Sequence, residues 1–131
     1  MRVGLDTSVV LRLLVGQPSD QSATAVAFLD AVHRRGDVAL VDDLVVAESY
    51  YALQFHYRIT KVEALSGLRQ MFDSGEIVST GRAAAVLSLP GLATAKPGFV
   101  DRLVHASYTS AADRMATFEK AAGKLDRVEV L

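Results

Sequence analysis

The sequence contains no cysteine and only three histidines, which limits the chemistry that its side chains can support. Without cysteine there is no disulfide framework, no cysteine-ligated zinc and no thiol nucleophile. The histidines, His33, His56 and His105, are scattered along the chain, so a histidine-rich metal site is not indicated either. A metal bound by this chain therefore has to be held mainly by carboxylates.

Long apolar runs and glycine-rich phosphate loops are also missing. No stretch approaches the ~18 apolar residues that a membrane span needs, and the N-terminal segment lacks the charged and apolar regions of a signal peptide. Neither a G-x-G-x-x-G nor a Walker A motif is present. We therefore expect a soluble cytoplasmic protein without a glycine-rich nucleotide-binding loop.

The composition is that of a well-packed protein with little net charge. Half of the 131 residues are apolar and 22% are charged, so we expect one domain, residues 1–131, with a sizeable core. The formal net charge is −1. Nucleic-acid-binding proteins usually have a basic balance, so the overall charge does not indicate one, although it permits a local basic patch.

Short apolar runs alternate with segments of helical periodicity, which is typical of a parallel sheet with helices on both faces. In the helix predicted at residues 20–35, the expected core residues include Ala23, Val26, Ala27 and Phe28. Functional sites in such sheets form outside the carboxyl ends of the strands. The predicted strands are residues 2–5, 38–41, 77–78, 114–117 and 127–130. The predicted helices are residues 7–15, 20–35, 42–57, 60–75 and 82–89, one following Pro97, and a short one at 118–123.

Four carboxylates occupy positions where apolar residues dominate: Asp6, Glu48, Asp101 and Glu119. Each lies near the end, or on the apolar face, of an element that is expected to pack in the core. Two unit charges ~4 Å apart repel by about 4 kcal/mol at an effective dielectric near 20. Acids that converge in this way need protons or divalent cations to neutralise them, so the pattern indicates a metal site.

Each acid also has a structural explanation. Asp6 precedes a helix and is a good N-cap candidate. The i±3 and i±4 neighbours of Glu48 are apolar, which predicts a buried carboxylate, but an Arg12 partner or a position at the edge of the apolar face remain open. Asp101 lies in a first helical turn, where the macrodipole favours acids, and His105 is a possible partner at i+4. Glu119 likewise begins a short helix.

Together these positions resemble the PIN-domain family, most closely its VapC-type toxin nucleases. The resemblance extends over the whole chain and lies in four segments. They are VGLDTSVVLRLL (residues 3–14), VVAESYYAL (residues 45–53), FVDRLVHA (residues 99–106) and TFE (residues 117–119). Two positions depart from the family pattern: His105 replaces a small residue, and Glu119 replaces an aspartate.

The resemblance implies a three-layer α/β/α fold with a central, mainly parallel, short-stranded sheet. It also implies a metal-dependent endoribonuclease with an RNA substrate, in which Mg²⁺ or Mn²⁺ is held by the four acids named above. Such hard cations prefer oxygen ligands. Thr7, Ser8 and Thr117 are expected to position water or substrate phosphate. A VapB-like antitoxin and a homodimer are further implications.

Glu119 introduces an alternative. Its extra methylene displaces the carboxylate by more than about 1 Å, and misplacements of that size can cost ~10²-fold in rate. Our hypothesis is that Glu119 acts through water while the other three acids hold the principal ion. The alternative is a catalytically weakened PIN-fold module that binds RNA or a protein partner. A phosphatase of the haloacid-dehalogenase type is disfavoured, because Ser8 stands where its second aspartate belongs.

Overall fold

The computed structural model describes residues 1–131, which form two compact units. The first unit is Met1–Thr80 and the second is Gly81–Leu131. The first contains β1 (Arg2–Gly4), α1 (Thr7–Val15), α2 (Ser19–Arg34), β2 (Val38–Val41), α3 (Asp43–Phe55), α4 (Lys61–Asp73) and β3 (Ile77–Ser79). The second contains α5 (Ala83–Leu87), η1 (Leu92–Thr94), α6 (Phe99–Tyr108), β4 (Met115–Thr117), η2 (Lys120–Lys124) and β5 (Val128–Val130).

The three strands of the first unit form a parallel sheet in the order β1-β2-β3. Val3 pairs with Ala39, and Ala39 pairs in turn with Ile77. Beyond β1, the Leu5 amide donates to the Leu40 carbonyl at 2.8 Å and extends the pairing by one residue. Asp6 therefore lies directly at the carboxyl end of the first strand, where functional sites form in such sheets.

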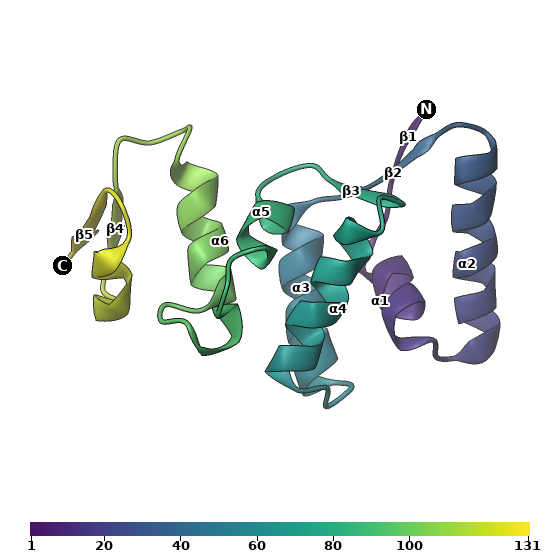
Figure 1. The fold of residues 1–131 in the computed structure, drawn as a ribbon, viewed down its shortest axis with the longest axis horizontal. Coiled ribbons are helices and arrows are strands. Elements are labelled where there is room, and N and C mark those ends of the chain that lie inside the picture. Colours follow the sequence, from purple (N-terminus) through teal and green to yellow (C-terminus); the bar gives the residue numbers. More distant parts are fainter. The chain divides into compact units, whose positions relative to one another are not determined.

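The helices of the first unit pack against one another and cover the sheet. Helix α1 contacts α2, α3 and α4, and α3 lies beside α4 (Figure 1). The chain moves from β1 to β2 and then to β3 in the same direction across the sheet. When two such connections both have the usual right-handed crossover, their helices lie on the same face of the sheet. Ala39, Val41 and Ile77 are buried, whereas Val38 and Val78, one residue along their strands, are 40% and 44% exposed. A layer of helices on the other face of the sheet stays a prediction.

The expected packing face of α2 is wrong. Ala23, Val26, Ala27 and Phe28 are exposed. The residues that α2 buries instead are Ala25, Leu29 and Val32. These lie at i, i+4 and i+7 and make a regular apolar stripe, displaced around the helix from the predicted one.

Helices α3 and α4 begin where the sequence predicts, because their N-caps form. The Asp42 carboxylate accepts a hydrogen bond from the Val45 amide at 2.8 Å, and the Thr60 hydroxyl accepts one from the Glu63 amide at 3.2 Å. Each cap satisfies a backbone donor that the first helical turn leaves unpaired.

In the second unit, β4 and β5 form a two-stranded parallel sheet. Their connection contains only the short helix η2, which packs on β5. Helix α5 packs on α6, and Phe99 and Leu103 of α6 are buried. The prediction of an α/β protein with short parallel strands is confirmed, and the three-layer arrangement and the single domain stay predictions. None of the helices is long and apolar enough to span a membrane.

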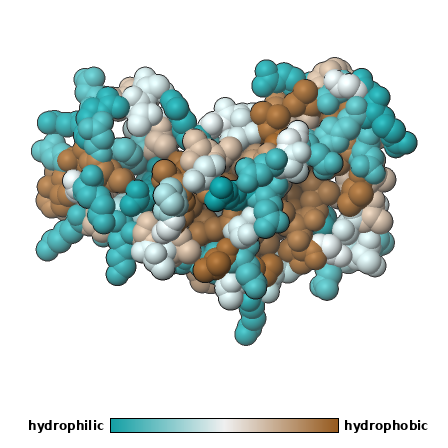
Figure 2. Space-filling model, viewed as in Figure 1, coloured by the Kyte–Doolittle hydropathy of each residue, from teal (hydrophilic) through white to brown (hydrophobic).

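Several large apolar side chains remain on the surface, where Figure 2 shows apolar patches among polar residues. On α3 they are Leu44, Tyr51 and Phe55, at 70%, 47% and 76% exposure. The Tyr51 and Phe55 rings stack with centroids 6.2 Å apart. The outward face of α3 is therefore apolar as well as its buried face.

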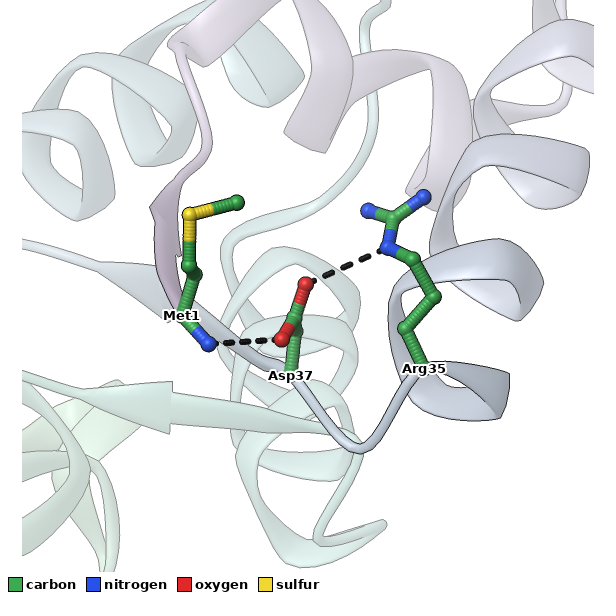
Figure 3. Close-up of polar contacts among 3 residues, drawn as sticks. All are labelled: Met1, Arg35 and Asp37. Atoms are coloured by element: carbon green, nitrogen blue, oxygen red, sulfur yellow. Dashed lines mark hydrogen bonds and ion pairs between the residues drawn. The ribbon is translucent and has the colours of Figure 1, made fainter.

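One cluster of charges ties the first strand to the end of α2. The Met1 ammonium lies 2.6 Å from one Asp37 carboxylate oxygen, and Arg35 Nε lies 3.2 Å from the other (Figure 3). The hydrogen bond from the ammonium, followed by that from the guanidinium, lowers the pKa of Asp37. Asp37 is therefore ionised at neutral pH and joins β1 to the turn that enters β2.

Candidate functional site

Asp6 occupies the N-cap position of α1 but does not act as a cap. Its backbone has the extended conformation of an N-cap residue, yet its side chain accepts no hydrogen bond from a helix amide. Instead, the exposed carboxylate accepts a hydrogen bond from the Ser8 hydroxyl at 3.1 Å. An N-cap aspartate is usually satisfied by helix amides. Asp6 therefore presents a carboxylate that one neighbouring hydroxyl orients and that has oxygen lone pairs left for a ligand.

Glu48 lies on the exposed side of α3, so the prediction of a buried glutamate is wrong. Its apolar neighbours Leu44 and Tyr51 are themselves exposed and do not cover it. Glu48 Oε1 accepts a hydrogen bond at 3.3 Å from the hydroxyl of Thr7, which follows Asp6 directly. The packing of α1 on α3 thus brings the first two predicted acids into one neighbourhood through Thr7.

Arg12, a possible partner for Glu48, is engaged elsewhere. Its Nε donates to the Gln21 side-chain oxygen at 2.6 Å, and its Nη1 lies 3.5 Å from the Tyr57 hydroxyl. The only side-chain hydrogen bond to Glu48 is therefore the neutral one from Thr7. The carboxylate keeps its charge available for a cation.

In the second unit, Asp101, Thr117 and Glu119 line one cavity of about 210 Å³. Asp101 comes from the first turn of α6, Thr117 ends β4, and Glu119 precedes η2. The two predicted acids of this unit therefore face a common space, although 18 residues separate them. The cavity is also lined by Val104, Tyr108, Met115, Ala116 and Ala122.

Glu119 has the structural role that its position suggests. It is the N-cap of η2, and its Oε1 accepts a hydrogen bond from the Ala121 amide at 3.4 Å. The Thr117 hydroxyl accepts one from the Glu119 amide at 3.0 Å. Both contacts fix the turn after β4. A bond of 3.4 Å is long for an amide donor, so the cap holds the carboxylate only weakly.

His105 does not pair with Asp101. Its Nε2 lies 2.6 Å from the Asp126 carbonyl oxygen, a contact between α6 and the turn that precedes β5. His105 is therefore a structural residue, and the exposed Asp101 carboxylate is left to the cavity.

Tyr108 was not among the residues that the sequence singled out, although it lines the cavity with Asp101. It lies two helical turns after Asp101 on the same helix, so the i, i+7 spacing was the available signal. A tyrosine at the end of a helix is too common to stand out by sequence alone.

Tyr50 lies two residues after Glu48 but points into the core, at 6% exposure. Desolvation by burial raises the pKa of its phenol. The phenol therefore stays protonated at neutral pH and is excluded as a general base.

The oxygen ligands present fit a hard divalent cation that is bound through few protein side chains. Every candidate ligand is a carboxylate or hydroxyl oxygen, which is the donor type that Mg²⁺ and Mn²⁺ prefer. Neither unit brings together three His, Asp or Glu side chains as a preformed metal cage. Mg²⁺ usually keeps several waters and is bound through one or two carboxylates. Asp6 with Glu48, and Asp101 with Glu119, each meet that lower requirement.

Comparison with known proteins gives no further assignment: no family model matches the sequence, and no match is found among curated proteins or solved structures.

Proposed function

We propose that the protein is a metal-dependent endoribonuclease of the PIN type, acting as the toxin of a VapBC-type toxin–antitoxin pair. It would hydrolyse RNA phosphodiester bonds with Mg²⁺ or Mn²⁺ held by Asp6, Glu48, Asp101 and Glu119. The proposal includes a three-layer arrangement around one central sheet, a VapB-like antitoxin as inhibitor, and a homodimer as the working form.

The hydrogen bond between Thr7 and Glu48 carries the proposal. It joins two residues 41 positions apart, and both belong to segments that resemble the nuclease family. The shared cavity of Asp101 and Glu119 supports the same interpretation for the later two segments.

The chain's own residues would contribute orientation and charge. Ser8 orients Asp6 by donating to one of its oxygens, and Thr7 does the same for Glu48. A divalent cation bound by these carboxylates would activate a water and neutralise charge developing on the phosphodiester.

The direct test is cleavage of RNA by the purified protein. Mixed cellular RNA is incubated with Mg²⁺ or Mn²⁺, with EDTA, and with an Asp6→Asn variant. The matched control is Asp73→Asn, which removes a surface carboxylate of the same unit that pairs only with Arg69. We expect discrete cleavage by the parent protein and by Asp73→Asn. EDTA and Asp6→Asn should each abolish it.

The capping role of Glu119 favours one alternative, a PIN-fold module that binds RNA or a protein partner with weakened metal chemistry. Well-folded protein that binds Mn²⁺ but cleaves no RNA, with Asp6→Asn indistinguishable from the parent, would contradict the nuclease and favour this module. Binding of RNA in the same samples would then identify RNA as its ligand.

A further inference from the structure

The first unit also has a cavity, which lies between α1 and α2 and has a volume of about 350 Å³. Ser8 and Arg12, one turn apart on α1, form its polar side together with Gln21 of α2. Val9, Ala25 and Phe28 form an apolar wall. The volume is at the low end of the range of about 300–1,000 Å³ that ligand clefts occupy.

Arg12 carries a charge in this cavity that no acid neutralises. Arg12 is half-exposed, and the two partners of its guanidinium, Gln21 and Tyr57, are neutral. It takes part in none of the ion pairs of the structure. A half-exposed guanidinium whose only partners are neutral keeps its charge and its remaining donors for an anion.

The 2.6 Å hydrogen bond from Arg12 to Gln21 also orients the guanidinium and its free donors. A guanidinium has five N–H donors in a rigid fork, and the two contacts to Gln21 and Tyr57 leave the others open. Such a fork matches the geometry of phosphate and carboxylate oxygens. Because the hydrogen bond to Gln21 already orients the side chain, less rotamer entropy is lost when an anion binds.

The apolar wall offers a surface for a base. Phe28 lines the cavity and is 42% exposed, although a phenylalanine on a helix normally packs inward. Bases of single-stranded nucleic acid stack on exposed aromatic rings without regard to sequence. A cationic fork and an exposed ring within one cavity are the two features that a nucleotide needs.

We propose that this cavity binds one nucleotide of a single-stranded RNA, with its phosphate on Arg12 and its base on Phe28. The choice of RNA rests on the proposed nuclease function. Ser8 belongs both to this cavity and to the Asp6 carboxylate, to which it donates. A strand seated here therefore continues directly to the candidate metal ligands, and the cavity holds a nucleotide that flanks the bond to be cut.

The test measures RNA binding without cleavage. A labelled single-stranded oligoribonucleotide is titrated with the protein in EDTA at several salt concentrations. A single-strand phosphate contact contributes about 0.7 to the slope of log K against log salt, so Arg12→Gln should reduce the slope by about 0.7. Arg12→Lys should keep the slope but bind less tightly, since it keeps the charge and loses the fork. Phe28→Leu should weaken binding by about 5- to 100-fold with the slope unchanged.

The matched control is Arg34→Gln, which removes an exposed arginine from α2 outside the cavity. It should leave both affinity and slope at the parent values. The thermal unfolding temperature of each variant shows whether weaker binding comes from a lost contact or from misfolding of α1 and α2. In the binding data, Arg12→Lys makes the same distinction, because a folded variant that keeps the charge should keep the slope.

Two results would overturn the subsite: a slope unchanged in Arg12→Gln, or no RNA binding by the parent protein. In the second case, Arg12-dependent binding of an acidic peptide would identify the ligand as a peptide. Cleavage in Mg²⁺ is scored separately. Cleavage with an unchanged slope in Arg12→Gln refutes the subsite alone. Arg12-dependent RNA binding without cleavage refutes the nuclease alone.

Discussion

Thr7 on α1 donates a hydrogen bond to Glu48 on α3, and this contact links the turn after the first strand to the helix after the second. Its two residues come from different βα units. The carboxylate end of the bond is exposed, so its value for stability is small. On the proposed function, the contact serves to orient Glu48.

Replacing Thr7 by valine should therefore affect metal use more than stability. Valine keeps the shape and removes the donor, so Glu48 loses its only side-chain hydrogen bond. Loss of a hydrogen bond that orients a metal ligand typically costs 10–100-fold in metal affinity or activity. We expect Thr7→Val to raise the Mg²⁺ concentration needed for half-maximal cleavage by about tenfold. Thr7→Ser, which keeps a hydroxyl, should be close to the parent, and equal Mg²⁺ dependence in all three proteins would refute the role.

The two roles of Glu119, as the N-cap of η2 and as a negative charge, can be tested separately. Glu119→Gln keeps a side-chain oxygen for the Ala121 amide and removes the carboxylate. If the acid contributes to the site, this variant should unfold at the parent's temperature and cleave RNA about 10- to 100-fold more slowly, the loss typical for a group that acts on a metal through its ligands.

The complementary variant, Glu119→Asp, restores the residue that the family pattern expects. Aspartate is also a good N-cap, so η2 should persist. We expect tighter Mg²⁺ binding and faster cleavage than in the parent. Unchanged metal affinity and unchanged cleavage would show that the difference between the two acids is immaterial here.

The sequence predicts the elements well because their ends carry local signals. The Asp42 and Thr60 caps start α3 and α4 as expected, and these hydrogen bonds depend on residues only three apart. The order of the acids along the chain was equally accessible. The order does not predict that Asp6 lies near Glu48 and Asp101 near Glu119, because these neighbours depend on how the elements pack.

The failures concern which side of a helix faces the core. In α2, alanines lie on both sides, so a stripe through Ala23 and Ala27 competes with the observed one through Ala25 and Leu29. Helix α3 is apolar nearly all round, so periodicity alone could not place Glu48. That Asp6 accepts a hydrogen bond from Ser8 rather than from a helix amide is likewise decided by side-chain geometry.

Ser49 offers a stability test within α3. Its hydroxyl is fully buried and has no hydrogen-bond partner. An unsatisfied buried polar group costs about 1–3 kcal/mol, so Ser49→Ala should raise the free energy of unfolding by about 1 kcal/mol. The measurement is urea unfolding followed by circular dichroism. A destabilised Ser49→Ala would mean that the hydroxyl has a partner in solution.

The charge cluster at Asp37 predicts how stability depends on pH. The Met1 ammonium and Arg35 lower the pKa of Asp37 below the value of about 3.9 that an unperturbed aspartate has. A group with a lowered pKa in the folded state stabilises the protein above its unfolded pKa, and this contribution is lost as the pH falls through the folded pKa. Asp37→Asn should therefore unfold at a lower temperature than the parent at pH 7. The two unfolding temperatures should converge as the pH falls below about 4.

Asp73→Asn is the control for this prediction, because its carboxylate pairs with Arg69 in a more exposed setting. Exposed pairs contribute little, so its unfolding temperature should follow that of the parent throughout the titration. A constant difference between Asp37→Asn and the parent from pH 7 down to pH 2 would refute the assignment, because a contribution that does not titrate cannot come from the Asp37 carboxylate. Arg35→Gln should reproduce part of the effect, since it removes one of the two cations and leaves the ammonium in place.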